Sequence, residues 1–200
     1  MTAATMRLSA PERRQRIVES ALGVFAGGSY SGATTADIAR AAGISEPILY
    51  RHFSSKRELY FACLDEAWSR LRTAFEEKIA EFGDADAVQA IGQTSLALRD
   101  LRVLPPTLWI QALTEAGEDQ EIRRYLSRHM REVHDFVADA VRRAQAAGGV
   151  PADRDADAEA WIFISAGLLV SVADRLGGLL GHADFQAIAA QRHRWLLGTG

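Results

Sequence analysis

The sequence predicts an all-α protein built from about nine helices. Apolar residues recur at intervals of three and four along nearly the whole chain, which is the period of one helix face. No segment shows the convincing alternation of apolar and polar residues that is typical of strands. Paired glycines and helix-capping residues punctuate the periodic segments. With 200 residues, 48% of them hydrophobic, the chain can form a helical body and a small appended domain.

Two helices are predicted before residue 45. The first covers residues 9–27, because Ser9 and Glu12 form a capping-box pair and paired glycines end the apolar pattern. The second covers residues 34–43, since a Thr-x-x-Asp pair repeats the capping arrangement at its start. At its end, Gly43 can adopt the positive φ that a tight turn requires.

A short helix and a long helix follow. The short helix covers residues 46–53, with Ser45 as its N-cap and a proline in its first turn. The long helix begins at Ser55, which pairs with Glu58, and its apolar stripe continues to Phe82 over about 40 Å at a rise of about 1.5 Å per residue. The remaining helices are predicted at residues 86–101, 106–116, 119–147, 157–176 and 183–197.

The predicted helices fall into two domains that differ in charge. An N-terminal domain covers residues 9–54, and a helical body covers residues 55–198. The net charge of the chain is −3, but residues 1–60 carry +3 and residues 61–200 carry −6. A basic N-terminal domain on an acidic body suits a protein that presents only that domain to phosphate groups. The alternative is that the charge of +3 is a chance fluctuation over 60 residues.

Residues 34–53 have the pattern of a helix-turn-helix. Ala39 is small enough for a second helix to cross closely, and Gly43 forms the turn between the helices. Leu49 and Phe53 lie one helical turn apart and are expected to anchor the second of these helices in the core. The opposite face of that helix would then present Glu46, Pro47, Tyr50 and Arg51 to solvent. Such a helix can enter a DNA major groove. The alternative is a helical hairpin that serves only to pack the domain and does not bind DNA.

The segment from about Glu12 to Glu66 resembles the DNA-binding domain of the TetR family of bacterial transcriptional regulators. The matching stretches are Phe25-Ala26, Thr34-Thr35-Ala36-Asp37-Ile38-Ala39, Gly43-Ile44-Ser45, Leu49-Tyr50-Arg51-His52-Phe53 and Ser55-Lys56-Arg57-Glu58-Leu59. These stretches cover about a quarter of the chain, and the remainder resembles the family in length, helix count and helix order. The resemblance implies a homodimer that binds a palindromic DNA operator and is released by a small ligand.

The resemblance also implies roles in phosphate binding for individual residues. Thr35 and Tyr50 should hydrogen-bond phosphates, and Lys56 should add positive charge at a helix start where backbone N–H groups already favour an anion. His52 either supports the same contact or is packed within the domain. Many family members carry a basic or larger polar residue where Ala36 stands here, so no guanine contact is assigned to the second helix.

Base contacts are expected at the start of the third helix. The Glu46 carboxylate can accept from a cytosine amino group, while Pro47 and Ile48 can meet thymine methyl groups. Arg51 suits either a base edge or a phosphate, and Ser45 is a cap rather than a base-contacting residue. The complete predicted set of DNA-contacting residues is Thr34, Thr35, Ser45, Glu46, Pro47, Ile48, Tyr50, Arg51, His52 and Lys56.

The last two helices are expected to form a dimer interface. The helix at residues 157–176 is apolar nearly all round and must therefore be covered on all sides, with core on one side and a second subunit on the other. The resemblance independently implies a four-helix bundle between two subunits. The predicted interface residues are Trp161, Leu168, Leu169, Val172, Phe185, Ile188 and Trp195.

The middle helices carry the candidate ligand-binding residues Trp109, Tyr125, His134 and Phe136. They lie where the family usually keeps its cavity, and together they suggest a mainly apolar pocket for a small hydrophobic or aromatic ligand. Each of them taken singly is equally compatible with ordinary core packing.

Other features of the chain argue against competing functions. Asp153, Asp155, Asp157 and Glu159 alternate, but they lack the glycine and spacing of a calcium loop and are expected to cap a helix. The histidines show no metal-ligand spacing, so neither a metal nor a cofactor is predicted. A single cysteine, Cys63, allows no disulfide within the subunit and fits a reducing cytoplasm. The longest uncharged apolar run has 14 residues, fewer than the about 20 that span a bilayer, so no membrane segment is expected.

We therefore expect a ligand-responsive dimeric repressor that is not an enzyme. An all-helical enzyme is the alternative from another class, but the sequence shows no nucleophile–base pair, metal set or phosphate loop. A DNA-binding regulator that is constitutive or controlled by a partner protein is the third possibility, and it differs from the first only in lacking a ligand.

Overall fold

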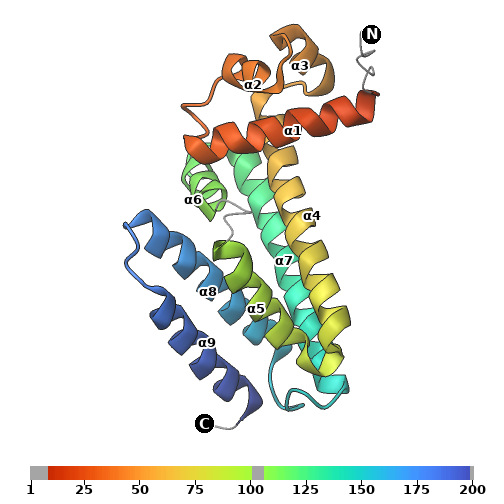
Figure 1. Cartoon of the computed structure of the whole chain (residues 1–200), viewed down its shortest axis with the longest axis vertical. Coiled ribbons are helices and arrows are strands. Elements are labelled where there is room, and N and C mark those ends of the chain that lie inside the picture. Colours follow the sequence, from red (N-terminus) through yellow and green to blue (C-terminus); the bar gives the residue numbers. More distant parts are fainter. Residues whose placement is uncertain (1–8, 101–105, 199–200) are drawn as a thin grey trace, which may run out of the picture. The chain divides into compact units, whose positions relative to one another are not determined.

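The computed structural model describes residues 9–100 and 106–198. Within these residues the chain is helical without any strand, which confirms the predicted all-α class. The helices are α1 (Ala10–Gly27), α2 (Thr35–Ala42), α3 (Glu46–His52), α4 (Lys56–Phe82), α5 (Ala87–Asp100), α6 (Pro106–Glu115), α7 (Gln120–Ala146), α8 (Ala156–Arg175) and α9 (His182–Leu197), with a 3-10 turn η1 (Asp84–Asp86) before α5 (Figure 1). Every predicted helix is present, and each predicted boundary lies within one residue of the observed one.

The chain divides into two compact units, residues 1–68 and 69–200. Helix α4 runs from the first unit into the second, because the division falls at Trp68. The two domains predicted at residues 9–54 and 55–198 place the boundary at the start of α4, and that assignment stays a prediction.

In the first unit, α1 is held by its cap and its buried face. The Ser9 N–H donates to the Glu12 carboxylate at 2.7 Å, and the Glu12 N–H donates to the Ser9 hydroxyl at 3.4 Å, so the predicted capping box is present. Phe25 is fully buried, with its ring edge-on to the ring of Tyr60. Cys63 is buried as well, and burial raises the pKa of its thiol far above the usual value, which keeps the sulfur protonated and unreactive.

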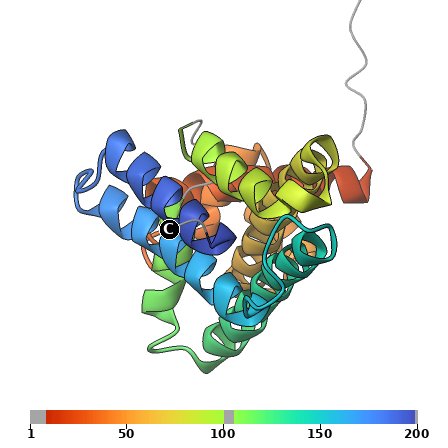
Figure 2. The same cartoon turned by 90° about the horizontal axis from the view of Figure 1, so that it is seen from below.

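In the second unit, α7 is the central helix and packs against α5, α6 and α8. Small residues on α7 let α8 approach closely: Ala138 is completely buried and lies in one cluster with Ala160 of α8. Figures 1 and 2 both show α9 running alongside α8. Arg192 of α9 is tied to α8 through Glu159, and Arg154 reaches the carbonyl of Trp195.

The connection between α7 and α8 passes so close to η1 that it requires a glycine. A Cβ added to Gly149 would overlap the carbonyl group of Ala85, and backbone atoms cannot move aside as a flexible side chain can. We expect Gly149→Ala to lower the free energy of unfolding by about 1–3 kcal/mol, the usual cost of overpacking. The measurement is urea denaturation followed by tryptophan fluorescence. Gly92→Ala is the control, since a Cβ there meets nothing within 4 Å and α5 gains a better helix former. Equal stabilities for the two variants would contradict this account.

Candidate nucleic-acid interface

Helices α2 and α3 form a helix-turn-helix around a left-handed glycine. Gly43 has φ of +67° and ends α2 as its C-cap, and its N–H donates to the carbonyl of Arg40 at 3.1 Å. The N–H of Ile44 reaches back to the carbonyl of Ala39 at 3.0 Å, which fixes the direction in which α3 leaves the turn. Leu49 of α3 is fully buried, so the opposite side of this short helix faces outward.

The hydroxyl of Thr34 is committed to the start of α2. It accepts from the N–H of Asp37 at 3.1 Å and donates to the Asp37 carboxylate at 2.6 Å. The hydrogen bond from Thr34 lowers the pKa of Asp37 below its usual value, and Arg40 at 2.8 Å adds to that effect. Thr34 is therefore placed as a helix cap.

A three-residue cluster joins the start of α2 to α3. The Thr35 hydroxyl donates to the Glu46 carboxylate at 2.6 Å and lies 3.3 Å from the Tyr50 hydroxyl. Because a hydroxyl has one proton and Thr35 gives it to Glu46, the Tyr50 hydroxyl is the donor in the second contact. Two residues predicted to bind phosphate are thus held side by side, with the carboxylate of a third beside them.

The outer side of α3 presents Pro47, Tyr50 and Arg51 to solvent, as predicted from the pattern, whereas Glu46, also predicted to face solvent, is half-buried against Thr35. Ile48 and His52 are half-buried. Ser45 occupies the N-cap position of α3 with extended backbone angles, but its side chain makes no capping hydrogen bond. The expectation that the Ser45 hydroxyl caps the helix is therefore wrong, and Pro47 in the first turn has no N–H group that could donate to it.

Comparison with known proteins agrees with this geometry. Residues 17–63 match the family described as bacterial regulatory proteins, tetR family. A 58-residue stretch is 48% identical to the HTH-type transcriptional activator FasR of Mycolicibacterium smegmatis, covering 29% of this chain and 26% of that protein. The fold matches a crystal structure of a TetR-family transcriptional regulator from Rhodococcus sp. with a TM-score of 0.82 and 21% identity, over 94% of this chain and 99% of that one. Residues 17–63 thus match the TetR family, and the rest of the chain shares the fold of that solved structure.

A longer relative shares more of the chain at lower identity. The HTH-type transcriptional regulator BetI of Rhizobium meliloti is 28% identical over 117 residues, which is 58% of each protein. The chain thus spans between about a quarter and three fifths of these two curated relatives. The range that matches the tetR family, residues 17–63, includes the whole helix-turn-helix formed by α2 and α3.

Lys56, at the start of α4, has two partners within the unit. Its ammonium group donates to the carbonyl oxygens of Tyr30 at 2.9 Å and Ala33 at 3.1 Å, and it lies 4.5 Å from the centre of the Tyr30 ring. An ammonium group has three donors, so one remains for a phosphate. Lys56 thus fastens the loop before α2, a role that could not be inferred from its neighbours in the sequence.

We expect Lys56→Met to destabilise the protein even in the absence of DNA. The variant keeps the apolar stem but leaves two part-buried carbonyl groups without a charged donor, which costs about 1–3 kcal/mol of unfolding free energy. The check is chemical denaturation of the full chain. Arg40→Met is the control, because it also removes one cation, but from an exposed ion pair worth at most about 1 kcal/mol. A Lys56→Met protein as stable as the control would refute this structural role.

Two arginines of α1 were not among the predicted DNA contacts. Arg13 and Arg16 line a cavity of about 290 Å³ together with Gly43, Ile44 and Ile48 of the helix-turn-helix. They lie three residues apart on the side of α1 next to the buried Ile17. This spacing, together with the positive charge of residues 1–60, is the sequence signal that could have identified them as candidate DNA contacts. Ile48, predicted to meet thymine methyl groups, shares this cavity wall with them.

Two of the candidate ligand-binding residues of α7 are packed against other rings. Tyr125 is buried and its ring stacks on His129, while Phe136 stacks on Phe75 of α4. The side chain of Trp109 lies outside the described residues. Their assignment to a ligand stays a prediction, and the packing of Tyr125 and Phe136 agrees with the alternative of ordinary core residues.

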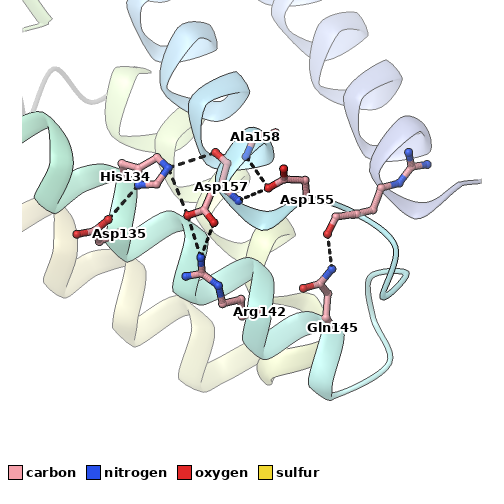
Figure 3. Close-up of polar contacts among 8 residues, drawn as sticks. His134, Asp135, Arg142, Gln145, Asp155, Asp157 and Ala158 are labelled. Carbon is pink, nitrogen blue, oxygen red and sulfur yellow. Dashed lines mark hydrogen bonds and ion pairs between the residues drawn. The ribbon is translucent and has the colours of Figure 1, made fainter.

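His134 belongs to a polar network between α7 and α8 (Figure 3). Its ring nitrogens lie 3.0 Å from the Asp135 carboxylate and 3.2 Å from the carbonyl of Asp157. Arg142 donates twice to the Asp157 carboxylate at 2.8 Å, and Asp155 accepts from the N–H groups of Asp157 and Ala158. Of the acidic run, Asp155 therefore caps α8, as expected from the sequence, while Asp157 and Glu159 lie in the first turn of that helix. Among the described residues, no group of His, Cys, Asp and Glu side chains could hold a metal ion.

Helices α8 and α9 carry an exposed apolar face. Its members are Trp161, Ile162, Leu169 and Val172 of α8, Leu176 directly after α8, and Ile188 and Trp195 of α9. Of the other predicted interface residues, Leu168 is half-buried, and Phe185 is only 4% exposed because it points into the unit. By length and composition α8 passes as a membrane span over Ala156–Ala173, with 33% of that stretch buried, but a single such helix is weak evidence.

A cavity of about 320 Å³ lies between α5, α8 and α9. Sequence reasoning did not predict it. Phe163 and Phe185 form part of its wall, and Arg192 is its buried cation. We call it the α5–α8–α9 cavity. The sequence offered one signal for it, namely Gly92 on α5 and Gly167 on α8, which leave room that larger side chains would fill.

Proposed function

We propose that the chain is a DNA-binding transcriptional regulator that represses as a dimer and leaves a palindromic operator when a small, mainly apolar ligand binds. The helix-turn-helix carries this proposal. Buried Leu49 and Phe53 hold α3, and the exposed Pro47, Tyr50 and Arg51 suit entry into a major groove. The match of residues 17–63 to the TetR family supports it, since this range includes the same residues.

Phosphate contacts arise by an exchange of hydrogen-bond acceptors. In the absence of DNA the donors of Thr35 and Tyr50 are used within the cluster that includes Glu46. A phosphate oxygen at this position accepts from the Tyr50 hydroxyl in place of Thr35. The Glu46 carboxylate then keeps one oxygen for a cytosine amino group, and Pro47 meets a thymine methyl group. His52 and Lys56 contribute at the rim of the same surface.

Dimerisation is supported by the exposed apolar face of α8 and α9. Several large apolar side chains exposed on two neighbouring helices are typical of an interaction site. The face is formed by two neighbouring helices, so pairing with its own copy about a two-fold axis buries both helices of each subunit. Two copies then present two helix-turn-helix units, which matches an operator with two half-sites.

A binding assay with the DNA upstream of the chain's own gene tests this function. We expect sequence-selective binding whose affinity falls steeply between about 50 and 200 mM salt, compared with a scrambled duplex of equal composition. Arg51→Met separates the two roles open to that residue, with Arg124→Met of α7 as the charge-matched control. Loss of a phosphate contact lowers the salt slope by about one on both duplexes, whereas loss of a base contact costs about 1–3 kcal/mol on the operator alone.

The mode of regulation needs two further measurements. Transcription in vitro from the bound promoter should fall on addition of the protein, and a rise would make it an activator. A ligand that raises the melting temperature should also release the DNA. If ligands stabilise the protein without affecting DNA binding, the regulator is constitutive or controlled by a partner. Absence of selective, salt-sensitive binding to any promoter fragment would overturn the DNA-binding function itself.

A further inference from the structure

Helix α3 has two flanks that carry different side chains. Successive residues of a helix turn by about 100°, so Ile48 and Tyr50, two positions apart, point about 160° away from each other. Leu49 between them is fully buried, and Pro47 and Arg51 face outward. A helix about 10–12 Å in diameter fills a major groove about 12 Å wide, so each flank of α3 faces one of the two DNA backbones.

The two flanks are bordered by different elements of the first unit. On the Tyr50 flank, the Thr35 hydroxyl at the start of α2 lies 3.3 Å from the Tyr50 hydroxyl. On the other flank, Ile48 lines a cavity of about 290 Å³ together with Arg13 and Arg16 of α1. One flank therefore offers hydroxyl groups to a DNA backbone, and the other offers arginines.

The guanidinium group of Arg16 is available to a ligand from outside the protein. Arg16 is exposed, and its side chain makes no hydrogen bond or ion pair with any of the described residues. The acidic residues nearest to it along α1 bind other groups: Glu12 accepts from the N–H of Ser9 at 2.7 Å, and Glu19 accepts from the Gln15 amide at 3.5 Å. The charge of Arg16 is thus not compensated by a direct partner on its own helix.

Arg16 reaches the turn between α2 and α3. Its Nη2 atom lies 4.0 Å from the position that a Cβ atom would take at Gly43. Arg13, three residues earlier on α1, lines the same cavity and adds a second positive charge. Arg14 is used differently, since its guanidinium carbon lies 4.5 Å from the centre of the Phe53 ring. Two of the three arginines of α1 therefore gather at one flank of α3.

We propose that Arg16, with Arg13 beside it, binds the DNA backbone on the opposite side of the major groove from Thr35 and Tyr50. This inference rests on the proposed function and adds a second point of attachment to it. The partner is the DNA backbone, because guanidinium groups beside a groove-binding helix suit phosphate oxygens, which they bind through paired, charge-assisted hydrogen bonds. Attachment at both flanks fixes the register and orientation of α3 without itself reading the sequence.

Arg16→Met should weaken binding of the full chain to the operator and to a scrambled duplex by the same factor. One phosphate contact contributes a slope of about −0.9 to log K against log salt. The expected loss at about 0.1 M salt is therefore about five- to tenfold, and the salt slope falls by about one. Arg16→Lys keeps the charge and should keep the slope. Arg124→Met of α7 is the control, because Arg124 is exposed and, like Arg16, has no ion pair among the described residues.

Single methylphosphonate substitutions in the operator locate the contact. Each substitution replaces one phosphate by a neutral group, and the set covers both strands. The wild type should lose affinity wherever a contacted phosphate is replaced, and Arg16→Met should become insensitive at one or two of these positions, as in a double-mutant cycle. Within the same half-site, Tyr50→Phe should become insensitive at a phosphate of the other strand, across the major groove.

Several outcomes would overturn this proposal. Arg16→Met that binds both duplexes like Arg124→Met would show that Arg16 contacts no phosphate, and a loss confined to the operator would make Arg16 a base-contacting residue. A lower melting temperature of Arg16→Met without DNA would give the side chain a structural role instead, and phosphates on one strand for Arg16 and Tyr50 would refute attachment at both flanks.

The wild-type protein separates this proposal from the function on which it rests. If the wild type shows no selective, salt-sensitive binding, the proposed function fails and the role of Arg16 fails with it. If the wild type binds selectively but Arg16→Met keeps the full affinity and salt slope, only the role of Arg16 is rejected.

Discussion

In the proposed dimer, Val172→Glu should separate the two subunits and abolish tight operator binding. Val172 is 42% exposed in the apolar face of α8, and it does not line the α5–α8–α9 cavity. In a two-fold interface the substitution places two uncompensated carboxylates out of water, at about 3–5 kcal/mol each. The dissociation constant of the dimer should therefore rise at least about a thousandfold, since every 1.4 kcal/mol is a factor of ten.

The matched control is Leu113→Glu. Leu113, on α6, is 43% exposed and lies outside the apolar face of α8 and α9, so it adds the same charge at nearly the same exposure. Sedimentation velocity across a range of concentrations measures the monomer–dimer equilibrium, and an operator titration measures the loss of DNA affinity. A Val172→Glu protein that remains dimeric and binds operator normally would place the dimer interface, if there is one, on another surface.

The helices could be predicted to within one residue because their ends are determined locally. Ser9 with Glu12, Ser55 with Glu58, and Gly43 each act within one turn of the helix that they begin or end. Such signals do not depend on the rest of the fold. The buried side of α3 was predictable for the same reason, since helical periodicity alone places Leu49 and Phe53 on one side.

The partners of polar side chains could not be predicted in this way. Lys56 binds carbonyl groups of the loop before α2, and the path of that loop depends on the packing of Tyr30. Glu46 accepts from Thr35 only because the turn at Gly43 brings the starts of α2 and α3 together. The residues in both contacts are far apart in the sequence. Residue type alone therefore suggested that Lys56 and Glu46 contact DNA, but it could not show which groups they bind within the protein.

The position of a cavity is even harder to predict from the sequence. The middle helices were expected to hold the ligand, but their aromatic side chains Tyr125 and Phe136 are packed against other rings. Phe185, expected at the dimer interface, instead lies in the wall of a cavity that α5, α8 and α9 enclose together. A cavity depends on the volumes that three helices leave between them, and no single helix pattern contains that information.

Arg192→Met should be among the most destabilising single substitutions in the second unit. The side chains of Arg192 and Glu159 are only 16% and 6% exposed, and burial lowers the pKa of Arg192 while Glu159 opposes that shift. Methionine keeps the apolar stem but leaves the Glu159 carboxylate buried without its counter-charge. Breaking a buried pair from one side costs about 3–5 kcal/mol, which is a large part of the stability of an ordinary domain.

A double variant separates the loss of the counter-charge from the loss of packing. Arg192→Met combined with Glu159→Leu removes both charges and should recover most of the loss, because replacing a buried pair by apolar side chains of similar volume is often neutral. Arg142→Met is the control for an exposed pair, since the side chains of Arg142 and Asp157 are 51% and 58% exposed. This variant should lose less than about 1 kcal/mol of unfolding free energy. Urea denaturation of all four proteins measures these differences. If the double variant were as unstable as Arg192→Met, the damage would come from lost packing around the guanidinium group and not from an orphaned charge at Glu159.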